Sequence, residues 1–189
     1  PQESHEVDVL TRPTFHRLLA ALSDLHSKGY CHDDIKGDNV FVLSPTQWVL
    51  GDLGNVREVQ HPLHSTRAWR RKNQWSDCRV NDVRRALKTY LTVLRQATED
   101  VEAFDTEFYA EHQPWSRLYW DFMRHPTSAD ELLSRSRIIS ADPVLNTAPD
   151  EVHGLAKVSS LQTGSARQAL SLAIDRELKC TSIAWNLKT

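Results

Sequence analysis

The sequence lacks the features expected of a membrane-spanning or secreted protein. No apolar run in the 189 residues approaches the ~20 residues that a membrane-spanning helix needs, and the N-terminus shows no signal-peptide pattern. The only three cysteines, Cys31, Cys78 and Cys180, are odd in number and widely scattered, with neither a disulfide framework nor zinc-like spacing. His61 and His64 have no cysteine or carboxylate at ligand spacing, so we interpret them as surface loop residues. Together these absences favour a reducing compartment, and we expect a cytoplasmic or nuclear protein.

A strong charge of either sign is also missing. The chain has 23 Lys and Arg against 25 Asp and Glu, a net charge of −2, so we expect neither nucleic acid nor an anionic membrane as a partner. With 40% hydrophobic and 25% charged residues, the chain suits one globular domain with a sizeable core. It begins with Pro1 rather than Met, as a fragment or a processed product would.

The most informative stretch is residues 31–39, which read C-H-D-D-I-K-G-D-N. Two short apolar runs follow, at 40–43 and 48–50, separated by four residues that include a proline, and then the letters G-D-L-G. Two apolar runs divided by such a break predict a β-hairpin. That hairpin would bring Asn39 and Asp52 together, where their amide and carboxylate oxygens suit Mg²⁺.

Four residues of this stretch resemble a catalytic set. Asp34 and Asn39 have the spacing of the protein-kinase catalytic loop, H-R-D-x-x-x-x-N, and Asp52 opens a D-L-G where that family has D-F-G. The chain thus resembles the C-terminal lobe of a eukaryotic-type protein kinase, with a phrase-level likeness to SR-protein kinases and fungal kinase-like proteins. The resemblance implies ATP and Mg²⁺ as cofactors, Asp34 as catalytic base, Lys36 as phosphate-contacting cation, and Asn39 and Asp52 as metal ligands.

Two amphipathic helices are predicted around this motif. Thr14 can cap the first, whose apolar residues follow the 3.6 period until Gly29 ends it, after an extended acidic lead-in over residues 1–13. The second begins at Asn81–Asp82 and carries an apolar stripe to Leu94. It resembles the buried central helix of the kinase C-lobe, which implies that Asp82 braces the catalytic-loop backbone and that His32 gives structural support.

The predicted lobe spans residues 14–134. A third helix is marked by the apolar and aromatic residues Trp115, Leu118, Tyr119, Phe122 and Met123. Only about twenty residues separate it from the second helix, so the family's intervening helix is shortened or absent. Residues 126–133 resemble the family's R-P-(S/T)-A-x-E-L-L ending, with Ser128 and Glu131 as a capping box.

Residues 135–189 form a C-terminal extension outside the resemblance. We expect a helix there, capped by Ser165 and Gln168, and a short strand or docking tail at 183–187. The fold class is therefore mainly α with a small β-hairpin, a protein-kinase-like C-lobe followed by a helical extension.

The segment from Asn55 to Asn81 has no periodicity and is predicted as a loop. Its S-T-R-A-W at 65–69 resembles the kinase segment that recognises residues beside the phosphorylated hydroxyl, which implies that Thr66 and Trp69 bind substrate. Residues 57–88 contain nine Lys and Arg against three acids. They form either a docking face for an acidic or phosphorylated substrate, or a solvated surface balanced by the acidic stretch at 99–111.

Departures from the family leave three hypotheses open. Asp33 replaces the arginine of H-R-D, the A-P-E positions read R-K-N, and neither G-x-G-x-x-G nor V-A-I-K occurs. The first hypothesis is a Ser/Thr kinase C-lobe whose N-lobe lies upstream or is supplied in trans, acting on a protein substrate. The second is a pseudokinase or interaction module that binds a partner protein. The third is a small-molecule kinase of the aminoglycoside-phosphotransferase type.

Overall fold

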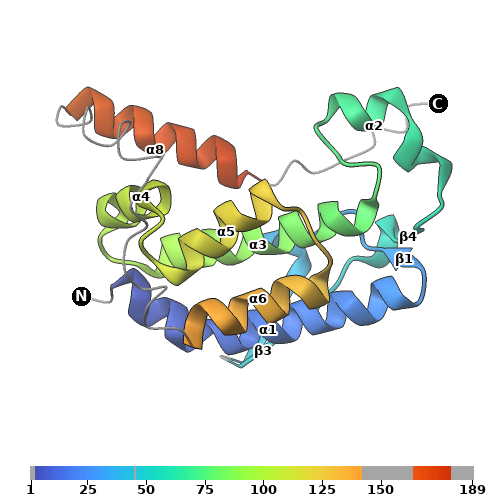
Figure 1. Cartoon of the computed structure of the whole chain (residues 1–189), viewed down its shortest axis with the longest axis horizontal. Helices are drawn as coiled ribbons and strands as arrows, with labels where there is room; N and C mark the ends of the chain where they lie inside the picture. Colours follow the sequence, from blue (N-terminus) through green and yellow to red (C-terminus); the bar gives the residue numbers. More distant parts are fainter. Residues whose placement is uncertain (1–2, 45, 142–163, 180–189) are drawn as a thin grey trace.

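The computed structural model describes residues 3–44, 46–141 and 164–179 (Figure 1). This part is mainly helical with a small β-hairpin, which confirms the prediction of a mainly α fold with a hairpin; its likeness to a protein-kinase C-lobe stays a prediction. The helices and strands in chain order are α1 Ser4–Ser27, β1 Tyr30–Cys31, β2 Val40–Ser44, β3 Gln47–Leu50, β4 Arg57–Glu58, α2 Arg67–Arg71, α3 Cys78–Ala97, α4 Val101–Ala110, α5 Pro114–Arg124, α6 Ala129–Ala141 and α8 Gly164–Leu178. Short 3₁₀ turns cover Gly37–Asn39, Leu53–Asn55 and Pro62–Ser65.

Helix α1 is longer than predicted. It begins at Ser4, so the expectation of an extended lead-in is wrong for residues 4–13, and Pro13 lies exposed inside the helix. The buried residues Val7 and Asp8 explain this, because Val7 joins the apolar core and the hydroxyl of Tyr90 donates to the Asp8 carboxylate. The sequence did not reveal this extension because a buried aspartate looks like a surface residue.

The core lies between α3 and the helices α1, α5 and α6, which contact it and, in part, one another (Figure 1). The predicted apolar stripe of α3 is confirmed: Val83, Ala86, Leu87, Tyr90, Leu91 and Leu94 are all at most 1% exposed. Burying such side chains contributes about 1.5–3 kcal/mol each for the larger ones. Helix α3 starts at Cys78 rather than Asn81, because the Asp77 carboxylate accepts a hydrogen bond from the backbone of Arg79 and caps the helix.

The predicted hairpin is present. Strands β2 and β3 pair antiparallel, with Val40 opposite Leu50. The segment between Asn55 and Asn81, which we predicted as a loop, is more ordered than expected. It contains α2 and the strand β4, whose Arg57 pairs with Cys31 of β1.

The C-terminal helices agree with the prediction in most respects. The intervening helix is the ten-residue α4, and the backbone of Glu131 donates to the Ser128 hydroxyl over 3.3 Å at the start of α6. Helix α8 contains the predicted extension helix and packs on α3 and α4. Helix α8 begins at Gly164, so Ser165 lies within its first turn, and the side chain of Ser165 is not among those described. The predicted strand at 183–187 lies outside the described part.

Candidate functional site

Asp82 of α3 holds the backbone of the loop that precedes Asp34. Its two carboxylate oxygens accept hydrogen bonds from the backbone N–H groups of His32, over 2.6 Å, and Asp33, over 2.9 Å. The carboxylate is fully buried, and His26 of α1 lies 3.2 Å from one of its oxygens. A buried charge that accepts several hydrogen bonds fixes its donors in place. The structure thus contains the contact implied for Asp82 by the resemblance.

His32 connects the loop to the end of the hairpin. Its Nε2 lies 3.0 Å from the carbonyl oxygen of Gly51, the residue before Asp52. Since a carbonyl can only accept, Nε2 carries the proton in this contact. The imidazole is completely buried, so it sets the spacing between residues 31–34 and the hairpin exit.

Three side chains converge on one oxygen of Asp34. Lys36 Nζ lies 3.0 Å from Oδ2, and the side-chain amides of Asn39 and Asn55 donate to the same oxygen over 3.2 and 3.3 Å. The Asn39 amide also donates to the Asp34 backbone carbonyl over 2.8 Å. The hydrogen bond to Asp34 raises the pKa of Lys36, and the negative charges of Asp34, Asp38 and Asp52 act in the same direction. Lys36 is therefore a cation across the neutral pH range.

The hairpin places Asn39 and Asp52 at its two ends. The Gly51 N–H donates to the Asn39 carbonyl over 2.9 Å, next to the Val40–Leu50 pair, so Asp52 follows directly after the residue opposite Asn39. Asn39 is buried and Asp52 is exposed, with a left-handed φ of 54°. An amide oxygen and a solvent-facing carboxylate fit a hard cation that takes its other ligands from water and phosphate, as Mg²⁺ does.

The two residues predicted to bind substrate have structural contacts instead. The Thr66 hydroxyl caps α2 by accepting from the backbone of Trp69 over 3.1 Å. The Trp69 ring is 2% exposed, packs with Cys31 and Cys78, and its indole N–H donates to the Trp75 carbonyl over 2.6 Å. The structure therefore puts Trp69 in the interior, and its predicted role in binding substrate stays a prediction.

The basic segment is paired mainly with carboxylates outside the acidic stretch. Arg57 contacts Asp33, Arg79 contacts Asp77 and Arg85 contacts Asp82. The acidic stretch has other partners within the described part, since Asp105 pairs with Arg95 and Glu111 with Arg124. For Arg57, Arg79 and Arg85 the charge balance is therefore local. The exposed cations Arg67, Arg70 and Arg71 of α2 keep the docking-face hypothesis open.

Cys31 and Cys78 form a disulfide bond, which corrects our prediction that the cysteines are not disulfide-bonded. Their Cα atoms lie 6.1 Å apart, and the bond joins β1, directly before the loop, to the first residue of α3. A separation of 47 residues leaves no local pattern from which the pair could be recognised. The compartment remains a prediction, because a reducing one would keep the pair as thiols.

The environment of His64 was also predicted incorrectly from the sequence. It is 2% exposed and its Nε2 lies 2.8 Å from Asp33 Oδ2, so its interpretation as a surface residue is wrong, whereas His61 is exposed as predicted. Both lie in an aperiodic segment, where no pattern separates a buried histidine from an exposed one.

A pocket of about 570 Å³ opens beside this site. Gly37 and Asp38 of the loop line one side, and residues of the hairpin, α3 and α8 line the rest, among them Trp48, Arg95 and Lys179. The charged residues Asp38, Arg95, Asp175 and Lys179 are part of its lining.

No protein-family model and no solved structure matches this chain. Among the described helices, none is both long and apolar enough to cross a membrane.

Proposed function

We propose that this chain supplies the catalytic C-lobe of a protein-kinase-like phosphotransferase, which transfers the γ-phosphoryl group of Mg-ATP to a serine or threonine hydroxyl of a protein. The observation that carries the proposal is the convergence of Lys36, Asn39 and Asn55 on Asp34 Oδ2. Within the described part these contacts all use one oxygen, which leaves Asp34 Oδ1 to accept a proton. We place the protein in the cytoplasm or nucleus.

The proposed roles follow from what phosphoryl transfer requires. Asp34 accepts the proton of the substrate hydroxyl as its oxygen attacks the γ-phosphorus and the bond to ADP breaks. Lys36, held beside Asp34, stabilises negative charge on the transferred group. The side-chain oxygen of Asn39 and the carboxylate of Asp52 would hold Mg²⁺, which neutralises charge on the phosphates. Asp82 and His32 keep these groups in register without touching substrate.

The nucleotide also needs a cover that these residues do not provide. The hairpin and the following turn present exposed apolar side chains, with Phe41 at 53%, Leu43 at 64% and Leu53 at 65% exposure. An apolar surface of this kind favours a protein contact. We propose that an N-lobe, encoded upstream or supplied in trans, covers the hairpin and completes the ATP site.

The proposal is tested with the native protein that contains this chain, isolated from its source cells. Its intact mass decides whether an N-lobe is part of the same polypeptide. Transfer from radiolabelled Mg-ATP to a Ser/Thr peptide library is then compared between the wild type and Asp34→Asn. Loss of a general base typically lowers kcat by about 10²–10⁴-fold, and we expect a decrease of that size.

Asp24→Asn is the matched control, because Asp24 is an exposed carboxylate on α1 and its backbone carbonyl accepts hydrogen bonds from Ser27 and Lys28 rather than from the loop. Equal transfer by the wild type and Asp34→Asn would contradict the proposal. Phosphorylation of hydroxylated small molecules without phosphorylation of peptides would replace it with the small-molecule kinase hypothesis.

The second candidate is a catalytically inactive interaction module, which the exposed apolar hairpin favours. In that case a partner captured by the wild type binds Asp34→Asn equally well, while Leu43→Ser on the hairpin weakens capture. Transfer activity that depends on Asp34 would exclude this candidate.

A further inference from the structure

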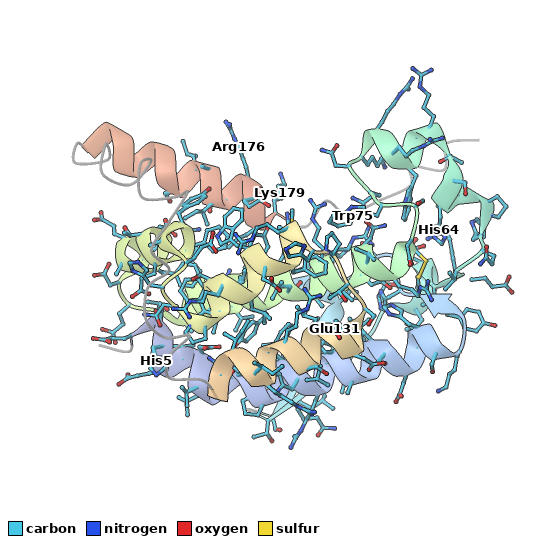
Figure 2. The ribbon with its side chains drawn as sticks, viewed as in Figure 1. His5, His64, Trp75, Glu131, Arg176 and Lys179 are labelled. Carbon is cyan, nitrogen blue, oxygen red and sulfur yellow. A yellow bond between two sulfur atoms is a disulfide. The ribbon has the colours of Figure 1, made fainter. Side chains whose placement is uncertain are left out.

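The Cys31–Cys78 disulfide lies beside two other metal-ligating side chains. Asp33, His64 and Cys78 each place a ligand atom within 4.8 Å of those of the other two, and Cys31 is bonded to Cys78. Figure 2 shows the sulfur–sulfur bond next to the labelled His64. All four side chains are at most 2% exposed, and they come from four segments: β1, the following loop, the Pro62–Ser65 turn and the start of α3.

His64 has the orientation of a metal-binding histidine. Its Nδ1 lies 3.0 Å from the carbonyl oxygen of Val59, which can only accept, so Nδ1 carries a proton and donates it to that oxygen. Metal-ligating histidines typically donate one ring N–H to a carbonyl or carboxylate in this way, which leaves the other nitrogen for the metal. In His64 the other nitrogen, Nε2, points toward Asp33, 2.8 Å away.

Asp33 has a carboxylate oxygen without a partner. Its Oδ2 is contacted by His64 and by Arg57 Nη1 over 3.3 Å, whereas no hydrogen bond reaches the buried Oδ1 within the described part. The residue is 1% exposed and has a φ of 64°, the left-handed conformation that side-chain-bearing residues rarely adopt. An unpaired buried carboxylate oxygen is costly, and a cation would satisfy it.

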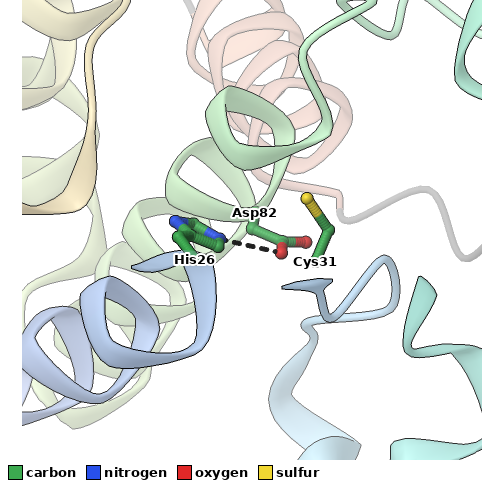
Figure 3. Close-up of side chains that lie close together, drawn as sticks. All are labelled: His26, Cys31 and Asp82. Atoms are coloured by element: carbon green, nitrogen blue, oxygen red, sulfur yellow. Dashed lines mark hydrogen bonds and ion pairs between the residues drawn. The ribbon is translucent and has the colours of Figure 1, made fainter. Parts of the chain in front are cut away.

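A neighbouring group of ligand atoms is less suited to a metal. His26, Cys31 and Asp82 also each place a ligand atom within 4.8 Å of those of the other two. Figure 3 shows these three side chains close together. The Asp82 oxygens, however, already accept from the backbone of His32 and Asp33, and the His26 Nε2 contacts the same carboxylate. A metal there would have to displace the hydrogen bonds that hold the loop.

We propose that, once the disulfide is reduced, Cys31, Cys78, His64 and Asp33 bind one Zn²⁺ ion. A dithiol reductant supplies two electrons and two protons, becomes a disulfide itself and leaves two thiols. Metal binding releases to solvent the two thiol protons and the proton that lies between His64 Nε2 and Asp33 Oδ2. The ligands are then the two thiolates, His64 Nε2 and the free oxygen of Asp33. Two sulfur donors, one imidazole and one carboxylate form a tetrahedral set typical of zinc.

The surroundings support this ligand set. Cys78 is the first residue of α3, and the positive end of a helix favours a thiolate. Arg57, next to Asp33, offsets the excess negative charge of two thiolates and a carboxylate around a divalent ion. The same two cysteines would thus join the loop before Asp34 to α3 either covalently or through a metal. The inference does not depend on the proposed phosphotransferase activity.

The test uses the full chain with Cys180→Ser, so that Cys31 and Cys78 are its only cysteines. The protein is reduced, and its metal is removed under an oxygen-free atmosphere. It is then titrated with Co²⁺ as a spectroscopic substitute for Zn²⁺. We expect one Co²⁺ per chain, with thiolate-to-cobalt charge-transfer absorption and the visible bands of tetrahedral cobalt, both abolished by an equivalent of Zn²⁺. The oxidised form of the same Cys180→Ser protein is the control and should show neither signal.

Two variants locate the site. His64→Gln removes a ligand and should weaken Co²⁺ binding by at least about 10-fold, a change seen even for residues that only support metal ligands. His61→Gln, the exposed histidine of the same segment, should bind as the parent does. Far-ultraviolet circular dichroism of each variant checks the fold. A folded, reduced chain without charge-transfer absorption, or unchanged affinity in a folded His64→Gln, would overturn the proposal.

Discussion

The two halves of the candidate site differ in how they are held. In the loop, the polar residues His32, Asp33 and Asp34 are at most 5% exposed, whereas in the hairpin the apolar residues Phe41 and Leu43 are more than half exposed. This reverses the usual distribution of polar and apolar side chains. Burial of the polar loop is tolerated only because Asp82 and neighbouring groups form hydrogen bonds with its polar atoms. The hairpin gains little stability from burial.

This difference indicates that contacts within the chain determine the geometry of the loop but leave the hairpin surface uncovered. The loop is positioned by α3, whose own burial in the helical core is extensive, so its geometry exists without a partner. The hairpin is connected to that loop through His32 and Gly51, but its outer side chains have no such cover among the described residues. A loop that is held in place within the chain, next to an uncovered apolar hairpin, is what our proposal of a C-lobe without its N-lobe would lead us to expect.

The strongest test of this comparison is Asp82→Ala. The substitution leaves the backbone N–H groups of His32 and Asp33 without this acceptor and removes one of the partners of the buried Arg85, which also donates to Gln74. Breaking a buried charged contact typically costs about 3–5 kcal/mol, and we expect the free energy of unfolding to decrease by that amount in urea titrations.

The matched control is Asp24→Ala on the exposed surface of α1, which should change the free energy of unfolding by less than about 0.5 kcal/mol. If Asp82→Ala were equally mild, the loop would be held by something other than α3, and the contrast between the two halves would lose its basis.

The sequence predicted best what depends on periodicity or on contacts close along the chain. The apolar stripe of α3 and the hairpin belong to this class, because each is indicated by the spacing of side chains within fewer than twenty residues. The start of α1 was missed because Asp8 is buried by a contact with Tyr90, 82 residues away. Long-range pairs of this kind leave no pattern in a single sequence.

The same reason separates the residues of the candidate site. Asp34, Lys36 and Asn39 were recognisable because they lie within six consecutive positions and their hydrogen bonds are local. The disulfide and the burial of His64 were missed because their partners lie 47 and 31 residues away. Asn55, which contacts Asp34, was not singled out although it directly follows the D-L-G.

A smaller effect is expected at the junction of the two halves, from Gly51→Ala. A Cβ at Gly51 would lie 2.2 Å from Phe41 Cε2, so the ring has to move. Because Phe41 is 53% exposed, the ring can turn toward solvent, and we expect a loss of about 1–2 kcal/mol, within the range for overpacked sites.

Phe41→Ala in the Gly51→Ala background removes the clash and should restore most of the loss. The four proteins form a double-mutant cycle, measured by urea unfolding, in which the coupling between the two positions should be at least about 0.5 kcal/mol. Additive effects would show that Phe41 is not what requires a glycine at position 51.

The smallest effect should come from the hairpin face itself, through Leu43→Ala. Leu43 is 64% exposed, so its truncation should change the free energy of unfolding of this chain by less than about 0.5 kcal/mol. Leu19→Ala removes the same atoms from a fully buried position of α1 and should cost about 2–5 kcal/mol. Equal costs at the two positions would mean that Leu43 is already covered within this chain. A large difference would leave the hairpin face open to another polypeptide, and the same Leu43→Ala protein could then be used to measure how much that face contributes to binding it.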